Sequence, residues 1–219
     1  MGNEHIMIFA DRLAAAQKLA EALHEYRGRN PLVLAIPRGA VPMAKVIAQS
    51  LQGEMDVVLV RKLRAPGNPE FAIRSIDEGG WMYLADYAGH AGASEDYINQ
   101  EVAQQLETIR YRRAQYTPNR SPIDPVGRIV IVIDDGLATG ATMIAALHAV
   151  NNRNPAELIC AIPVAPLDTL QKLHGKAHKI VCLTSPDDFY AVGQFYVDFP
   201  QVSDEEVINC LADTKSSFD

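Results

Sequence analysis

The sequence contains little cysteine, little positive charge and no long apolar run. Its three cysteines are far apart, without CxxC spacing or paired histidines. This excludes a disulfide framework and a cysteine zinc site and favours a reducing cytosol. The apolar runs are too short to cross a membrane, and the first residues lack the pattern of a secretory signal. With 20 basic and 27 acidic residues the net charge is −7, opposite to what non-specific nucleic-acid binding requires. We therefore expect a cytoplasmic protein with no membrane or nucleic-acid partner.

Short apolar segments alternate with amphipathic ones along the chain. We expect strands at 31–37, 56–62, 81–85, 128–135, 157–165 and 179–185, and helices at 11–28, 42–51, 94–113, 139–151 and 167–173. Strands that are apolar throughout are typical of a parallel sheet covered by helices on both faces. The sequence therefore predicts an α/β fold with a mainly parallel sheet, as a single domain over 1–219.

Two segments outside this alternation are also interpreted. Residues 64–80 are rich in glycine and proline, and we expect them to form a long loop. Arg110, Arg112 and Arg113 lie at the end of the helix expected from Ser94, where the helix dipole favours basic side chains. We interpret the three arginines as solvated helix-end charges.

The segment 129–142, IVIVIDDGLATGAT, combines the features of a phosphosugar site. Asp134 and Asp135 end a buried strand, where two adjacent carboxylates are costly unless something uses them. Gly136 and Gly140 permit tight turns. The N–H groups and hydroxyls of residues 139–142, at a helix N-terminus, favour an anion. One loop thus offers acids for sugar hydroxyls and donors for a phosphate, which fits a ribose 5-phosphate.

Three alternatives compete with this interpretation. A Walker A loop needs a Gly-Lys-Ser/Thr sequence, and the lysine is missing. A Rossmann fingerprint needs G-x-G-x-x-G directly after a strand, and the sequence has no such run. The third alternative is a strand end whose acid pair and glycine turn serve only the fold.

The same segment resembles the PRPP-binding motif of type I phosphoribosyltransferases, in which two acids follow a strand and precede a T-G-x-T-type loop. The resemblance extends from about Phe9 to Asp198 and implies the fold of that family, a mainly parallel sheet with a small C-terminal hood at approximately 163–200. It implies that Asp134 and Asp135 are catalytic and hold the ribose hydroxyls, directly or with Mg²⁺. The 5′-phosphate loop that it implies comprises Ala138, Thr139, Gly140, Ala141 and Thr142.

Two further segments resemble the pyrophosphate-binding parts of the family. Arg38 and Gly39 match a turn that binds pyrophosphate, often through a non-proline cis peptide. Arg61, Lys62 and Arg64 begin a stretch that resembles the flexible loop closing over PRPP, nearest to that of adenine-type enzymes of purine salvage. The resemblance implies that these basic groups neutralise the leaving pyrophosphate.

The sequence gives a weaker indication of the residues that would assist the acceptor than of those that would bind PRPP. Glu78 and Glu70 lie in the expected loop and are candidates to assist the nucleophile, although a solvated carboxylate is the simpler interpretation of each alone. Hypoxanthine-type enzymes carry an acidic base shortly after the acid pair, where this sequence has Ala138. Base catalysis of the hypoxanthine type is therefore not expected from this loop.

The hood segment interleaves aromatic and acidic residues, SPDDFYAVGQFYVDFP. A flat aromatic wall with polar edges suits a planar heterocycle. The resemblance implies that Tyr190 stacks on the base, that Val192 gives a backbone contact and that Asp198 serves a Mg²⁺ site. Packing of a C-terminal cap explains each residue equally well when it is taken singly.

The resemblance implies transfer of 5-phosphoribosyl from PRPP to a nitrogen nucleophile, with a nucleobase as the expected small heterocyclic acceptor and Mg²⁺ as cofactor. It also implies a homodimer. A non-catalytic, PRPP-binding regulator on the same fold is an open alternative. So is an unrelated Mg²⁺-dependent α/β protein in which Asp134 and Asp135 belong to a phospho-acceptor site.

Overall fold

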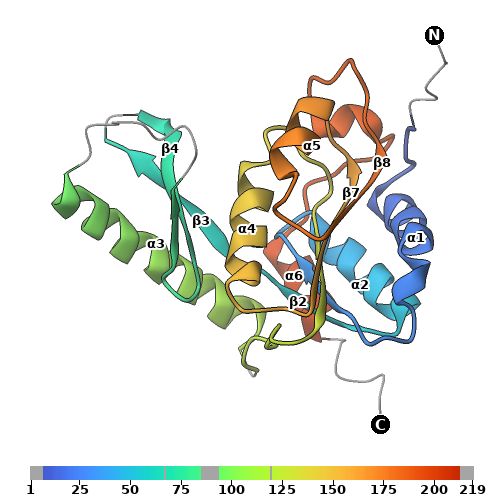
Figure 1. Cartoon of the computed structure of the whole chain (residues 1–219), viewed down its shortest axis with the longest axis horizontal. Helices are drawn as coiled ribbons and strands as arrows, with labels where there is room; N and C mark the ends of the chain where they lie inside the picture. The colour runs from blue at the N-terminus through green and yellow to red at the C-terminus, as the bar shows by residue number, and fades with distance from the viewer. Residues whose placement is uncertain (1–6, 67, 85–93, 119, 213–219) are drawn as a thin grey trace.

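A five-stranded parallel sheet forms the centre of the molecule (Figure 1). The computed structural model describes residues 7–66, 68–84, 94–118 and 120–212, without the side chains of 65, 68–73, 83 and 84. The strand order is β2-β1-β6-β7-β8. These strands are β1 (Leu32–Ala35), β2 (Glu54–Val57), β6 (Ile129–Ile133), β7 (Glu157–Val164) and β8 (Lys179–Thr184). All neighbouring pairs are parallel, which confirms the predicted mainly parallel sheet.

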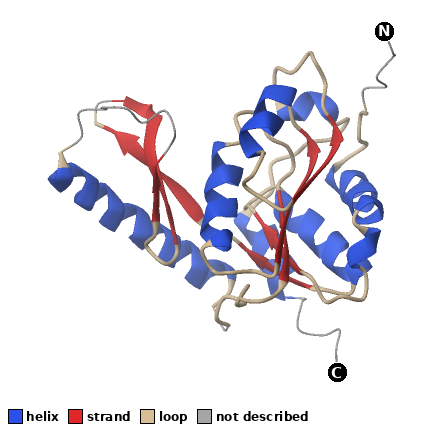
Figure 2. Cartoon of the chain, viewed as in Figure 1, coloured by secondary structure: helices blue, strands red, loops and turns tan. Residues whose placement is uncertain are grey.

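Helices cover both faces of this sheet because its strands are apolar on both sides (Figure 2). Val33 and Ile131 belong to the core under α1 (Arg12–Ala22) and α2 (Ala40–Leu51). Their sequence neighbours Leu32 and Val130 belong to the opposite core, under α4 (Ala141–Asn151) and α5 (Leu167–Leu173). The predicted α/β class with helices on both faces of the sheet is thereby confirmed.

Shorter elements complete this main body. The turns η1 (His24–Tyr26) and η2 (Val192–Phe195) are 3₁₀ helices. Helix α6 (Asp204–Ala212), which the sequence patterns do not single out, packs against α2 and α3. Within the described ranges, no helix is both long enough and apolar enough to cross a bilayer.

The prediction for residues 56–80 is right in part for the strand and wrong for the loop. The expected strand 56–62 is divided at residues 58–59 between β2 and β3 (Val60–Ala65), and most of the expected loop is strand. β4 (Asn68–Asp77) pairs with β3 on one side and with β5 (Met82–Leu84) on the other, both antiparallel. Of the prolines and glycines in this stretch, Pro69 lies on β4, and Gly79 and Gly80 lie between β4 and β5. Arg61, Lys62 and Arg64 lie on β3 rather than on a loop.

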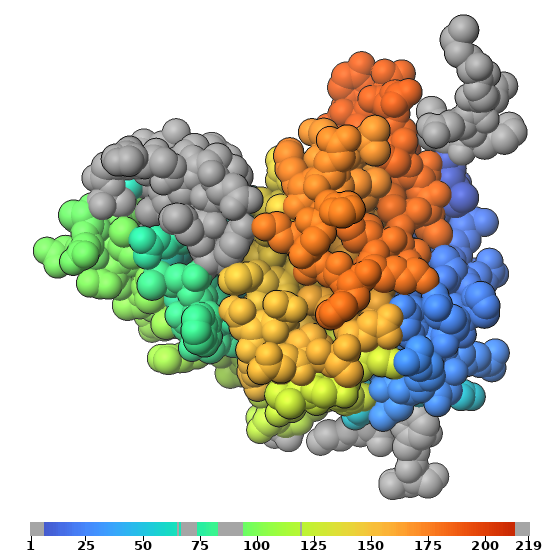
Figure 3. Space-filling model, viewed as in Figure 1, coloured from blue at the N-terminus to red at the C-terminus, as the bar shows by residue number. Residues whose placement is uncertain are grey.

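This small sheet and the long helix α3 (Glu95–Tyr116) form what we call the arm. Helix α3 begins after Ser94 as predicted, and the Ser94 hydroxyl accepts a hydrogen bond from the Tyr97 N–H at 3.2 Å. In Figure 1 the arm projects from the side of the main body. Its strands β3 and β4 contact α4 at the base of the arm, and Figure 3 shows the two parts meeting on this face.

Candidate functional site

The acid pair, Asp134 and Asp135, directly follows β6 at the carboxyl edge of the parallel sheet. The Asp135 N–H donates to Asp134 Oδ1 at 2.8 Å, and Arg12 Nε donates to Asp135 Oδ2 at 2.9 Å. Burial raises the pKa of Asp134 well above its ordinary value, and the charge of Asp135 raises it further. The pair is therefore a partly buried concentration of negative charge that Arg12 only partly offsets, a favourable place for a cation or for hydroxyl donors.

The turn after β1 lies against this acid pair. The peptide bond between Pro37 and Arg38 is cis, as the family resemblance implies. A Cβ atom at Gly39 would lie 1.9 Å from Asp135 Oδ2, so a side chain at this position would displace the Asp135 carboxylate. Two motifs about a hundred residues apart in sequence therefore meet at one edge of the sheet, as predicted for loops at the carboxyl ends of parallel strands.

The phosphate loop, residues 138–142, leads into the N-terminus of α4. Gly140 caps the helix in a left-handed conformation, φ 74°, which favours glycine. Ala138 and Thr139 are exposed, and the Thr169 hydroxyl holds the loop by donating to the Ala138 carbonyl at 2.6 Å. The helix N-terminus presents its unpaired N–H groups here, as an anion-binding loop requires.

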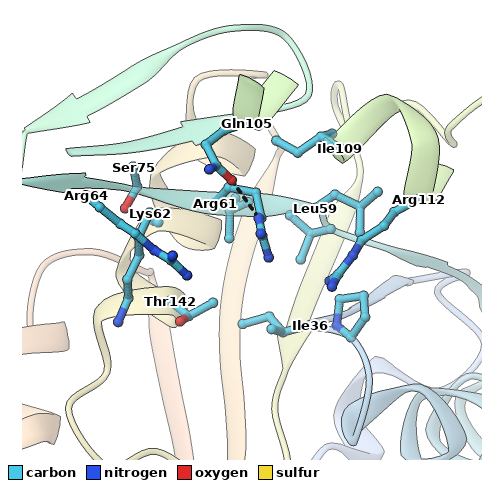
Figure 4. Close-up of a pocket in the computed structure, with 14 residues that line it drawn as sticks. Ile36, Leu59, Arg61, Lys62, Arg64, Ser75, Gln105, Ile109, Arg112 and Thr142 are labelled. Atoms are coloured by element: carbon cyan, nitrogen blue, oxygen red, sulfur yellow. Dashed lines mark hydrogen bonds between the residues drawn. The ribbon is translucent and has the colours of Figure 1, made fainter. Parts of the chain in front are cut away.

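A cavity of about 360 Å³ separates the arm from the main body. Fourteen residues line it, and none of them is acidic. The cations that line this basic cavity are Arg61, Lys62, Arg64 and Arg112. In Figure 4 their side chains extend from the arm toward Thr142 and Ile36 of the main body. Burial lowers the pKa of Arg61, and the positive charges of Arg112 and Arg64 lower it further. The arrangement therefore favours an anion.

Two lining residues on α3 were missed as site residues. Arg112 was interpreted as a solvated helix-end charge, but it lines the basic cavity. Gln105 lines it too, and its Oε1 accepts from Arg61 Nε at 3.0 Å. The signal available in the sequence is their spacing: residues 105, 109 and 112 share one face of a helix.

Two predicted acidic residues, Glu78 and Asp198, lie apart from this arrangement. Glu78 binds Arg113, accepting from its Nε at 2.7 Å and from its Nη2 at 2.5 Å, and it does not line the basic cavity. The side chain of Glu70 lies outside the described residues. Asp198 is exposed, and within the described ranges no three His, Cys, Asp or Glu side chains are grouped as a metal site would need.

Arg113 is a correction to the interpretation of the helix-end arginines. It also donates to Asp56 Oδ1 at 2.8 Å and to the Val57 carbonyl at 2.9 Å. The Asp56 side chain is 1% exposed and that of Arg113 is 12% exposed. Arg113 is therefore a buried clamp between the arm and β2 rather than a solvated charge.

Some of the hood residues pack in the interior, and others are exposed to solvent. Val192 packs against Gly136, where an added Cβ would lie 2.5 Å from Val192 Cγ1. Tyr196 is buried, and its hydroxyl donates to the Asp135 carbonyl at 2.6 Å. Phe199 stacks on Tyr196 at 4.6 Å between ring centroids and carries Arg12 on its ring. Tyr190 is 88% exposed, whereas Phe195 is buried and stacks on Phe189. Of the expected aromatic wall, Tyr196 is the ring whose hydroxyl binds the acid-pair loop.

A match to a family model over most of the chain decides which protein family the chain belongs to. Residues 6–200 match the family model of the phosphoribosyl transferase domain. This chain belongs to that family. Two Mycobacterium tuberculosis proteins, from strains CDC 1551 and H37Rv, are 38% identical to this phosphoribosyl transferase domain over 208 residues. Both are named only provisionally as phosphoribosyl transferases.

The extent of these matches differs between the relatives. The aligned region is 93% of this phosphoribosyl transferase chain but 46% of each mycobacterial protein, so the chain spans about half the length of these curated relatives. The crystal structure of TT1426 from Thermus thermophilus is 43% identical, with a TM-score of 0.85, and the match covers 95% of this chain and 99% of that one. The fold described above, including the arm, is thus similar to a solved structure over nearly its whole length.

Proposed function

We propose that this domain transfers 5-phosphoribosyl from PRPP to a nitrogen nucleophile, a nucleobase in the simplest case, and releases pyrophosphate. The observation that carries the proposal is that the Gly39 turn meets the acid pair beside the N-terminus of α4. The approach is so close that a Cβ added to Gly39 would lie 1.9 Å from Asp135 Oδ2. In this proposal the phosphate loop binds the 5′-phosphate, and Asp134 and Asp135 bind the ribose hydroxyls. The residues proposed for the pyrophosphate are Arg38, Gly39, Arg61, Lys62 and Arg64.

The charges of the site suit the reaction. The bond from C1 of the ribose to the pyrophosphate oxygen breaks, the bond from the nitrogen to C1 forms, and the nitrogen loses a proton to water or to the leaving pyrophosphate. Positive charge develops on the sugar, where the partly uncompensated Asp134 stabilises it. Negative charge develops on pyrophosphate, where the basic cavity stabilises it. Glu78 has a structural role in this proposal, because it accepts hydrogen bonds from Arg113, the clamp between the arm and β2.

The acid pair also fits Mg²⁺. Carboxylate oxygens are ligands that Mg²⁺ prefers, and the raised pKa of Asp134 indicates that its negative charge lacks sufficient compensation. Because the described ranges group no third ligating side chain with the pair, most ligands would come from substrate and water. Bound there, the ion would supply charge stabilisation and a template for the substrate.

The test is pyrophosphate release from MgPRPP against a panel of purines, pyrimidines and simple amines, together with calorimetric titration of MgPRPP. We expect tight MgPRPP binding and release with at least one acceptor. Binding without release from any acceptor would favour the non-catalytic regulator, and absence of binding would refute both. The proposal includes a cytoplasmic homodimer, which sedimentation and cell fractionation would test.

A further inference from the structure

Adjacent arginines on α3 have different surroundings. Arg113 is held by Asp56, Glu78 and the Val57 carbonyl. Arg112 points into the basic cavity (Figure 4), and among the described residues no hydrogen bond or ion pair engages its guanidinium. A helix turns by about 100° per residue, so neighbouring side chains leave in different directions. One arginine therefore anchors the arm while the other remains available to a ligand.

The surroundings of Arg112 favour an anionic ligand. Arg61, Arg64 and Arg112 line the same cavity. Burial lowers the pKa of Arg61, and the positive charges of Arg112 and Arg64 lower it further, as expected where like charges repel one another. Glu101, whose negative charge raises the pKa of Arg61, is not a lining residue, and its Oε1 accepts from Gln105 Nε2 at 3.1 Å. Repulsion among partly buried cations is relieved by a ligand that carries several negative charges.

The position of Arg112 identifies the part of the substrate that it would meet. Arg112 lines the cavity together with Pro37, the residue before Arg38. One helical turn further along α3, the Tyr116 hydroxyl donates to Asp204 Oδ1 at 2.6 Å, and Arg38 Nη1 lies 3.7 Å from Asp204 Oδ2. Arg112 therefore lies at the end of the cavity beside the turn that our proposed function assigns to pyrophosphate.

We infer that Arg112 binds the diphosphate group of the substrate and of the released product, across the cavity from the Pro37–Arg38 turn. This inference rests on the proposed function and adds a residue of α3 to it. A guanidinium suits the task because its planar fork donates two parallel hydrogen bonds to phosphate oxygens. The arm then supplies cations to the diphosphate from two elements, β3 and α3.

The experiment is calorimetric titration of the full chain with inorganic pyrophosphate in buffer containing Mg²⁺. We expect Arg112→Gln to weaken pyrophosphate binding at least tenfold. Arg112→Lys should weaken it less, about threefold to fivefold, because lysine keeps the charge and loses the fork. Arg110→Gln is the matched control, since Arg110 is exposed on the same helix, and it should bind within twofold of the unchanged chain.

Thermal unfolding of each variant separates a loss of binding from a loss of fold. If Arg112→Gln unfolds at a lower temperature, Arg112→Lys carries the test. Unchanged affinity in the folded variant, or an equal loss in Arg110→Gln, would overturn the role of Arg112 and leave the proposed function standing. If the unchanged chain binds neither pyrophosphate nor MgPRPP, the proposed function itself fails.

Discussion

Replacing each acid of the pair by asparagine should shift stability in opposite directions. Asp134 is partly buried beside another carboxylate, and both the burial and the neighbouring charge raise its pKa. At pH 7 its charge therefore costs free energy in the folded state. Asparagine keeps the shape and the oxygen that accepts from the Asp135 N–H at 2.8 Å. We expect Asp134→Asn to raise the free energy of unfolding by about 1–3 kcal/mol, the usual size of effects at single buried groups.

The pH dependence has a definite sign. A carboxyl group whose pKa is raised by folding binds its proton more tightly in the folded than in the unfolded state. Its contribution to stability is therefore favourable at low pH and is lost as the pH rises from about 4, near the unfolded pKa, toward the folded one. This loss should be present in the unchanged chain and absent in Asp134→Asn.

Asp135→Asn is the matched comparison. Asp135 Oδ2 accepts from Arg12 Nε at 2.9 Å, and the two side chains are 16% and 12% exposed. Removing the carboxylate charge leaves Arg12 poorly compensated, although Arg12 still donates to the Pro200 carbonyl at 2.6 Å. We expect a loss of about 1–3 kcal/mol, together with at least a tenfold loss of turnover with MgPRPP.

The assay is thermal and urea unfolding of the three proteins at pH 5, 7 and 8, with turnover measured in parallel. For a chain of this size, about 2–4 °C of melting temperature corresponds to 1 kcal/mol. A destabilised Asp134→Asn, or shifts of the same sign in both variants, would refute the reasoning from burial and repulsion. Undiminished turnover of Asp135→Asn at saturating MgPRPP would remove that residue from the proposed site.

Two further substitutions test the contacts around the site. Gly39→Ala places a Cβ 1.9 Å from Asp135 Oδ2, so we expect at least a tenfold loss of MgPRPP affinity by calorimetry, and unchanged affinity would contradict the close approach. Arg113→Met leaves Asp56, 1% exposed, with Arg120 at 3.2 Å as its remaining ion pair among the described residues. Urea unfolding should show a loss of about 3 kcal/mol, against less than about 0.5 kcal/mol for the exposed control Arg110→Met. Equal losses would refute the clamp.

The sequence predicts the main sheet well because burial on both faces produces continuous apolar runs. β6 and β7 are such runs, and each is almost wholly buried. The arm is different. β3 carries Arg61, Lys62 and Arg64 into a basic cavity, so its pattern lacks the apolar signal of a strand. The prolines and glycines of residues 64–80 then suggest a continuous loop, whereas β4 occupies most of this stretch.

The sequence predicts the motifs of the candidate site but not the long-range contacts between its residues. Asp134, Asp135 and Gly39 follow strands, and the carboxyl ends of parallel strands meet at one edge. By contrast, Arg12 is 123 residues from the acid that it binds. Arg112 lies on α3, whose orientation depends on its packing against β3 and β4. The sequence does not predict this packing. Pairings of this kind are set by tertiary packing and leave no local pattern.

Arg112 and Arg113 of α3 also constrain how the chain can change in length. An insertion of one residue between Gln105 and Arg112, both of which line the cavity, would turn Arg112 by about 100° relative to Gln105. If Gln105 kept its hydrogen bond to Arg61, Arg112 could then no longer face the cavity. Arg113 could likewise no longer face Asp56. Residues added ahead of Ser94, the helix cap, impose no such rotation. The proposed diphosphate site therefore fixes the length of a helix segment that contains few buried apolar residues.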